Sequence, residues 1–337
     1  MTTPSLPATS SPVAGRTDET GAKPALRRLV VPTSTPSAPT DQRPRPSAPL
    51  DLGQRSRGRA VKDVVARVVM WSSFGVAMIP LVWILYTVVS KGISLVLQSQ
   101  WWTNSQRNVN STDVGGGAIH AIQGTLLQAG VTAVIAVPIG VLTAIYLVEY
   151  GRGPVARAVS FMVDILTGVP SIVAALFVYA VWVTTFGFQR VGFAVCLALV
   201  LLMLPVVVRS TEEMLKLVPN ELREASYALG VPKWKTISRV VLPTALGGII
   251  TGVLLGLARV VGETAPLIIL APYTTFINFN LFNGPMAALP TLIFANFGND
   301  VDPAIARMWA AALTLILFVL VLNIAGRLVA RFSSVRR

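Results

Sequence analysis

Long apolar stretches dominate this chain from Val64 onward and restrict it to a membrane-spanning fold. Each stretch is close to or longer than the ~20 residues that a helix needs to cross a ~30 Å hydrocarbon layer. Strands are disfavoured because a membrane barrel needs alternating segments of ~10 residues, whereas these runs are continuously apolar. We therefore predict an all-α polytopic membrane protein with six transmembrane helices. The predicted spans are residues 66–89, 122–148, 158–184, 192–209, 242–271 and 308–330.

The composition excludes a water-soluble globule and argues against metal chemistry. Of the 337 residues, 53% are hydrophobic and only 13% are charged, and the mean hydropathy is +0.65. Soluble domains average roughly a quarter charged. Cys196 is the one cysteine, so no internal disulfide is available, and its apolar surroundings indicate a packing role. His120 is the one histidine, which leaves no cluster of ligands for zinc.

Residues 1–62 differ sharply in composition from the rest of the chain. They are rich in Pro, Ser, Thr and Arg, and the prolines interrupt any periodic pattern. Such a segment cannot bury enough apolar surface to offset its ordering entropy. It also lacks the apolar core of a secretory signal peptide. We expect a disordered cytoplasmic tail over 1–62 and a six-span membrane domain over 63–337.

Basic residues are distributed unevenly among the connections between the predicted spans. They concentrate before the first span, between the second and third, between the fourth and fifth, and at the C-terminus. The connections on the other side carry Lys91, Arg107, Arg190 and Arg307. Loops rich in Lys and Arg stay in the cytoplasm, so both termini should be cytoplasmic. This orientation signal and the basic tail account for the net charge of +13 without nucleic-acid binding.

The connection between the fourth and fifth spans, residues 209–241, contains the signals of a short helix outside the membrane. Asn220 is a suitable N-cap after Pro219, and Gly230 can adopt the left-handed conformation that ends a helix. These signals predict a helix over about 221–229. Its first turn is acidic, as the helix dipole favours, and a partly apolar stripe runs along one face. The stripe comprises Leu222, Ala225, Ser226 and Leu229.

This short helix needs a surface to pack against. Isolated helices shorter than ~12 residues are marginal in water. One alternative is that it lies on lipid headgroups, but such helices are usually rich in Lys and Arg. Residues 221–229 contain one Arg and two Glu instead. A partner protein is the favoured interpretation.

The sequence around the short helix resembles the EAA loop of ABC importer permeases. The family pattern is EAA-x3-G-x9-I-x-L-P, and here Glu224-Ala225-Ser226 is followed at the same spacings by Gly230 and by Val240-Val241-Leu242-Pro243. Ser226 and Val240 depart from the pattern by small changes in volume. In that family the short helix inserts into a groove on a separate ATPase, so the resemblance implies a coupling helix at about 221–229. The implied ATPase-coupling residues are Glu221, Glu224, Ala225, Gly230 and Pro243.

Two ionisable residues lie within the predicted fifth span. Arg259 and Glu263 are four residues apart, so a helix places them on one face. An ionisable group inside the bilayer costs at least ~2.5–3.5 kcal/mol and usually faces a bundle interior or an aqueous cavity. In one interpretation Arg259 and Glu263 pair with each other and strengthen helix packing. In the other, the guanidinium of Arg259 presents two parallel hydrogen-bond donors to an anion. Gly262 and Pro266 should bend or break the helix at this point.

Other small or polar residues in the spans are expected to be structural. Asp164 should bond Thr167 or Ser171 or approach a neighbouring helix, since a carboxylate would repel an anionic substrate. Glu149 is predicted to be a boundary residue at the cytoplasmic side. A small-xxx-small stripe that permits close helix contact comprises Gly248, Gly252 and Gly256. The prolines expected to kink spans are Pro138, Pro170 and Pro205.

The run RVVGETAPL, residues 259–267, is similar to the RAxGETAPL sequence in the fifth span of phosphate-uptake ABC permeases, specifically their A-type (PstA-like) subunits. Val260 replaces Ala and leaves both ionisable positions intact. The resemblance covers roughly residues 65–335 and implies the transmembrane domain of a type I ABC importer in the bacterial cytoplasmic (inner) membrane. It further implies inward translocation of inorganic phosphate, with Arg259 and Glu263 in the substrate pathway.

The same resemblance implies a set of partners. They are a homologous second permease subunit (PstC-like), a dimer of ATPase subunits (PstB-like) and an extracytoplasmic phosphate-binding protein (PstS-like). ATP and Mg²⁺ would bind the ATPase, so we expect no cofactor on this chain. The sequence has neither a G-x-x-x-x-G-K-[ST] phosphate loop nor a plausible nucleophile and base pair, so we also expect no catalysis.

Three alternatives to a phosphate permease stay open at this point. The first is the same machine carrying another oxyanion, such as sulfate or molybdate, because the EAA pattern does not discriminate between them. The second is an ion-coupled secondary transporter that uses Asp164, Glu263 and Arg259. The third is a membrane scaffold that transports nothing, which would tolerate the loss of Arg259.

Overall fold

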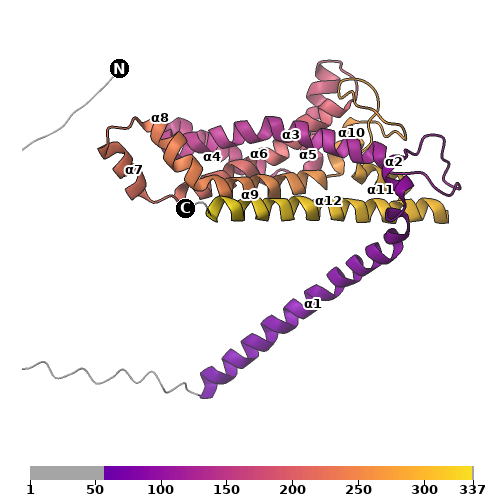
Figure 1. Cartoon of the computed structure of the whole chain (residues 1–337), viewed down its shortest axis with the longest axis horizontal. Coiled ribbons are helices and arrows are strands. Elements are labelled where there is room, and N and C mark those ends of the chain that lie inside the picture. Colours follow the sequence, from indigo (N-terminus) through magenta and orange to yellow (C-terminus); the bar gives the residue numbers. More distant parts are fainter. Residues whose placement is uncertain (1–56, 336–337) are drawn as a thin grey trace, which may run out of the picture. The chain divides into compact units, whose positions relative to one another are not determined.

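A computed structural model describes residues 57–335, and every regular element in that range is a helix (Figure 1). The first elements are α1 (Arg57–Val96), α2 (Ser99–Thr103), α3 (Ile119–Ile145), the π-helical turn η1 (Tyr146–Tyr150), α4 (Gly153–Gly168), α5 (Ser171–Tyr179) and η2 (Ala180–Thr185). The next are α6 (Gly192–Lys216), α7 (Asn220–Ala228), α8 (Lys233–Thr236), η3 (Ile237–Val241) and α9 (Leu242–Val261). The last are α10 (Ala265–Leu270), α11 (Leu289–Asn296) and α12 (Asp302–Val335). The predicted tail over 1–62 lies outside the described residues, except for 57–62, which open α1.

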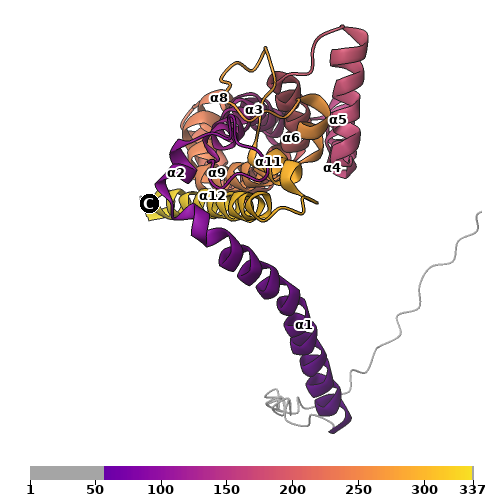
Figure 2. The same ribbon diagram turned by 90° about the vertical axis from the view of Figure 1, so that its right-hand side faces the viewer.

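The chain divides into two units, Met1–Ala66 and Arg67–Arg337, and the second contains the helix bundle. Within that bundle α6 packs against α3, α4, α5, α9 and α10, and α9 packs against α12 (Figures 1 and 2). The most apolar window of α6 is 67% buried, whereas the other four long apolar helices reach 22% at most. Met203 and Val207 of α6 are fully buried. The bundle therefore assembles around α6.

In the described part of the chain, five helices are long and apolar enough to cross a membrane. They are Val61–Val96, Ile119–Tyr150, Gly192–Lys216, Lys233–Val261 and Asp302–Leu328. The helices Gly153–Gly168 and Ser171–Thr185 pass the same test together, but they bend by 107° between them. With this bent pair counted as one span, the number is six, as predicted.

Pro170 breaks the predicted third span, residues 158–184. Proline has no N–H to continue a helix, and its ring disfavours helical backbone in the preceding residue. Val169 is accordingly extended, with φ −71° and ψ 124°. The expected proline effect is therefore present, but as a break rather than a mild kink. Pro138 and Pro205 behave differently, since α3 and α6 continue through them.

The predicted fifth span, residues 242–271, is interrupted near Gly262 and Pro266, as the sequence indicates. α9 ends at Val261, and α10 begins at Ala265 with Pro266 in its first turn. A proline is tolerated there because the first N–H groups of a helix have no partner within the helix. The interruption leaves Glu263 outside regular helix, just beyond the end of α9.

The predicted small-residue stripe brings α9 close to α6. A Cβ atom added to Gly252 would overlap Oγ of Ser210, and one added to Gly248 would overlap the sulfur of Met214. The short Ser210 side chain cannot move out of the way, so Gly252 excludes a larger residue, whereas at Gly248 the flexible Met214 side chain would have to shift. A Cβ on Gly256 would meet its nearest neighbour at 3.4 Å. Close contact is thus confirmed for two of the three glycines.

Candidate functional site

The predicted short helix is α7, at one end of the bundle beside α8 (Figure 1). Most of its side chains are exposed, including those of Glu221, Glu224 and Ala225. Leu229, just after its last residue, is 83% exposed. Gly230 has φ +74°, the left-handed conformation expected of a residue that ends a helix. Nine helical residues with so little buried surface still need a partner to stabilise them.

Two details of the predicted helix differ in the structure. The helix spans Asn220–Ala228 rather than 221–229, and the preceding residue is Pro219. Asn220 is therefore not an N-cap; its Oδ1 instead accepts a hydrogen bond from Nη1 of Arg223, at 3.3 Å. Of the predicted stripe only Ser226 is buried, with its hydroxyl 2.8 Å from that of Thr236. The rest of the stripe is available to a partner.

Pro243, the last residue of the EAA-like pattern, opens the helix that leads to the second candidate site. It lies in the first turn of α9, immediately after the π-helical turn η3. α9 then runs from this end of the bundle to Arg259 in its last turn. One helix thus joins the two regions that the sequence singled out.

Arg259 and Glu263 lie close together at the interruption between α9 and α10. Their side chains approach to 3.9 Å between Nε and Oε1, the outer limit of an ion pair. Backbone bonds close the end of α9, from the N–H of Gly262 to the carbonyl of Arg259 and from the N–H of Glu263 to that of Val260, both 3.1 Å. The side chain of Arg259 is 58% exposed and that of Glu263 is 17% exposed. A loosely held, exposed guanidinium of this kind can exchange its partner for an anion.

A cleft of about 330 Å³ borders the interruption. It is lined by Gly262 and Thr264, by residues of α11 such as Phe294, and by Phe297 and Leu315. Neither Arg259 nor Glu263 lines it. Its lining is largely apolar, so this cleft by itself offers little to an oxyanion.

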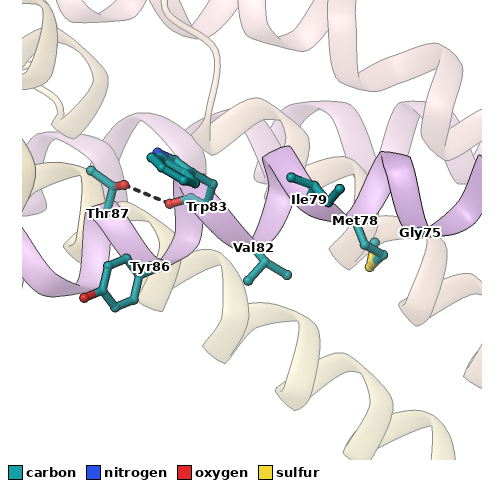
Figure 3. A pocket seen from close by; sticks show the side chains of 7 residues that line it. All are labelled: Gly75, Met78, Ile79, Val82, Trp83, Tyr86 and Thr87. Atoms are coloured by element: carbon teal, nitrogen blue, oxygen red, sulfur yellow. Dashed lines mark hydrogen bonds between the residues drawn. The ribbon is translucent and has the colours of Figure 1, made fainter.

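A larger hollow, of about 560 Å³, follows the surface of α1 (Figure 3). All of its lining residues come from this one helix, between Gly75 and Thr87, and none is charged. The hydroxyl of Thr87 donates to the carbonyl of Trp83 at 2.8 Å, so it is turned back to its own helix. This hollow is the surface of an apolar helix and not an anion site.

Asp164 pairs with a neighbouring helix, which is one of the arrangements expected for it, rather than with Thr167 or Ser171. It accepts a hydrogen bond from Nη2 of Arg209, which comes from α6. Nη1 of the same arginine bonds Glu212 at 2.5 Å, and Lys216 bonds Glu212 at 2.7 Å. The hydroxyl of Thr167 donates to a backbone carbonyl instead. Asp164 thus joins α4 to α6 within a chain of alternating charges.

Sequence reasoning does not find the contacts made by Arg223, Glu149 and Lys233. In the sequence Arg223 and Lys233 add to the orientation signal, and Glu149 is only a boundary residue. In the structure Nη2 of Arg223 lies 3.0 Å from Oε1 of Glu149, and Lys233 donates to the backbone carbonyl of Glu149. The two members of the ion pair are 74 residues apart. No local pattern joins residues at that separation.

Comparison with known proteins places the chain among transport proteins. A family model described as "Binding-protein-dependent transport system inner membrane component" matches residues 136–334, which include α7 and the interruption after α9. The chain belongs to this family. Over 303 residues it is 53% identical to phosphate transport system permease protein PstA 1 of Mycobacterium tuberculosis (strain CDC 1551 / Oshkosh), covering 90% of this chain and 99% of that protein.

A second relative and a solved structure agree with this placement. The chain is 54% identical over 293 residues to phosphate transport system permease protein PstA of Mycobacterium leprae (strain TN), covering 87% of this chain and 96% of that protein. The crystal structure of a bacterial alginate ABC transporter, in complex with an alginate pentasaccharide-bound periplasmic protein, contains a chain of the same fold. Its TM-score is 0.53 at 14% identity, covering 83% of this chain and 96% of that chain.

These findings confirm the main expectations from the sequence. The chain is a PstA-like membrane permease of the ABC importer type, and it is not an enzyme. Its all-α fold is that of a type I ABC importer transmembrane domain. As a permease of this type it is one component of a multi-subunit importer. The roles of individual residues in α7 and at Arg259 stay predictions.

Proposed function

We propose that this chain is the membrane permease subunit of an importer that carries inorganic phosphate into the cell, driven by ATP hydrolysis on a separate subunit. The observation that carries the proposal is the 53% identity to a phosphate permease over 90% of this chain. Similarity of that extent reaches far beyond the two short motifs recognised in the sequence. The fold supports it, because an all-helical bundle with up to six spans can provide a pathway across a membrane.

The α7 end of the bundle faces the cytoplasm in this proposal. The segment between α6 and α9 carries a high density of basic residues, which favours the cytoplasmic side. Both termini then lie in the cytoplasm, and so does the predicted tail over 1–62. The membrane is the bacterial cytoplasmic membrane.

α7 is the surface that docks on an ATPase subunit (PstB-like). The exposed Glu221, Glu224 and Ala225 provide the contact, and the left-handed turn at Gly230 sets the angle at which the chain leaves it. Pro243 opens the helix that continues towards the substrate pathway. ATP and Mg²⁺ belong to the ATPase dimer and not to this chain.

Arg259 makes a transient contact with phosphate in the pathway. Its exposed guanidinium offers parallel donors that match two oxygens of an oxyanion. Glu263, at 3.9 Å, competes for the same donors and keeps the affinity low, as transport requires, because a carried ion has to leave again. A second permease subunit (PstC-like) completes the pathway, and a phosphate-binding protein (PstS-like) delivers the substrate.

The proposal is tested with the complete importer reconstituted in liposomes. We expect uptake of radiolabelled phosphate that requires both permease subunits, the binding protein, and ATP on the side of the membrane that carries the ATPase. An excess of sulfate or molybdate should leave the uptake unchanged. Competition by either oxyanion would show that the same machine carries a different substrate.

A matched control distinguishes an ATP-driven importer from a secondary transporter. The control complex contains an ATPase whose catalytic glutamate is replaced by glutamine, with this chain unaltered. Uptake should stop in that complex, although it still assembles. Uptake that persists and follows an ion gradient would contradict the proposal.

A further inference from the structure

Arg223 lies on the inner side of α7, with its side chain only 13% exposed. Its Nε and Nη2 donate to Oε1 of Glu149 at 3.1 and 3.0 Å, and Nη2 donates also to the carbonyl of Leu215 at 2.9 Å. Its Nη1 donates to the carbonyl of Val218 at 2.6 Å and to the side chain of Asn220 at 3.3 Å. A guanidinium has five N–H donors, so this one is fully engaged.

The acceptors outside α7 belong to the ends of two membrane-spanning helices. Leu215 lies in the last turn of α6, where the helix dipole favours a cation, and Val218 lies two residues beyond the end of that helix. Glu149 belongs to η1, the π-helical turn that ends the span beginning with α3. One side chain of α7 therefore joins this helix to two different spans.

Glu149 is held as firmly as its partner. Its side chain is 6% exposed, and a buried carboxylate is stable only with a counter-charge. Lys233, the first residue of α8, donates to its backbone carbonyl, and the same ammonium group lies 4.7 Å from the ring centroid of Tyr150. The end of the α3 span is thus attached to the elements on both sides of the turn at Gly230.

The backbone leaves the helical conformation at both ends of α7. At one end Pro219 is extended, with ψ 142°, and at the other Gly230 is left-handed, with φ +74°. Both are turns of non-helical backbone, and the second is closed by bonds from the N–H of Gly230 to the carbonyl of Tyr227, at 2.9 Å, and from the N–H of Val231 to that of Ser226, at 3.2 Å. The buried bonds of Arg223, together with the hydroxyl pair of Ser226 and Thr236, oppose a pivot of α7 about these turns.

We propose that Arg223 and Glu149 are positioning residues that transmit the movement of α7 to the α3 and α6 spans. This inference rests on the proposed docking of α7 on an ATPase. The exposed side chains of α7 receive the movement, and the buried pair passes it to η1 and to the end of α6. Without the pair, α7 pivots on its turns, and ATP is hydrolysed without a matching displacement of the spans.

A double-mutant cycle in the complete reconstituted importer tests this role. The variants are Arg223→Gln, Glu149→Gln and both together, and the measured quantities are the amount of ATPase that copurifies and the phosphate taken up per ATP hydrolysed. We expect normal assembly and about a tenfold lower uptake per ATP in each single variant. The double variant should be no worse than either single variant, because removing both partners leaves no unpaired buried charge.

Arg239→Gln is the matched control, because Arg239 is an exposed arginine of the same loop, in η3. It should leave uptake per ATP unchanged. The inference would be overturned if uptake per ATP were unchanged in both single variants. It would also be overturned if the fold-reduction in the double variant equalled the product of the two single reductions. If the unaltered complex itself fails to bind the ATPase or to import phosphate, it is the proposed function that fails.

A distance measurement keeps the inference testable if the variants do not assemble. Spin labels are placed at Arg152→Cys, just beyond η1, and at Leu229→Cys, at the end of α7. The native Cys196 is buried, so the label should react with the two introduced cysteines. With the pair intact, the distance between the labels should be the same in the nucleotide-free and the ATP-trapped complex. A shift greater than the width of the distance distribution would show that α7 moves independently of the α3 span.

Discussion

The pair of Arg223 with Glu149 and the pair of Arg259 with Glu263 have the same chemistry, but they are held very differently. The first has 3.0 Å between its atoms and side chains that are 13% and 6% exposed, and every guanidinium donor is used. The second has 3.9 Å between its atoms, and its arginine is 58% exposed. Burial and the number of engaged donors therefore distinguish a fixed arginine–glutamate pair from a loose one.

The physical reason lies in the cost of breaking each pair. Removing one partner from a buried ion pair leaves an uncompensated charge and costs about 3–5 kcal/mol. An exposed pair contributes only about 0–1 kcal/mol. An anion can therefore compete with Glu263 for Arg259 at a much lower cost than it could compete with Glu149 for Arg223.

The largest effect is expected for Arg259→Ala. A hydrogen bond to a charged group contributes about 1.5–3 kcal/mol, so the loss of the parallel pair should lower phosphate uptake by at least about 100-fold. Assembly with the other subunits should be normal, because the side chain is exposed in this chain. Uptake of labelled phosphate and copurification of the ATPase measure the two quantities.

Arg259→Lys is the matched control for that variant. It keeps the charge but loses the planar fork, so uptake should fall to a level between those of the native protein and of the alanine variant. Equal uptake in all three would mean that Arg259 only pairs with Glu263. Both arginines, Arg223 and Arg259, would then be structural.

An intermediate effect is expected for Gly230→Val, at the other end of the molecule. Its φ of +74° costs an L-residue roughly 1–2 kcal/mol, although no atom lies within 4 Å of an added Cβ. The strain should alter the exit angle of α7 and lower phosphate uptake per ATP by about tenfold. Gly230→Asn should be milder, since asparagine tolerates this conformation better. Uptake per ATP that is unchanged in the valine variant would show that the turn does not set the orientation of α7.

The features that could be predicted from the sequence are those with a local signal. Apolar stretches indicate the spans, Gly230 indicates the end of α7, and Gly262 with Pro266 indicates the interruption after α9. Each signal depends on the backbone preferences of a few adjacent residues. The identity of the family was likewise visible in two short runs of fixed spacing.

The features that could not be predicted depend on contacts between distant elements. Glu149 meets Arg223 at a separation of 74 residues, and Arg209 meets Asp164 at a separation of 45. In the sequence both arginines add only to the orientation signal. The N-cap prediction at Asn220 failed for a local reason: the helix already includes Asn220, and its side chain accepts from Arg223, three residues along the same helix. Long-range ion pairs follow from the packing of the helices and not from the order of residues.

The smallest effect is expected for Glu263→Gln, and its direction distinguishes competition with the substrate from support of the guanidinium. The pair is loose and its arginine exposed, so losing the carboxylate changes binding by only about 0.5–1 kcal/mol. Because Glu263 competes with phosphate, the neutral variant should bind phosphate more tightly. The KM for uptake should fall about two- to fivefold, while the maximal rate falls because release is slower. The rate and its dependence on the concentration of the phosphate-loaded binding protein provide both values. A KM that rises would mean that Glu263 orients the guanidinium for the substrate, and the Arg259 pair would then resemble the fixed pair at α7.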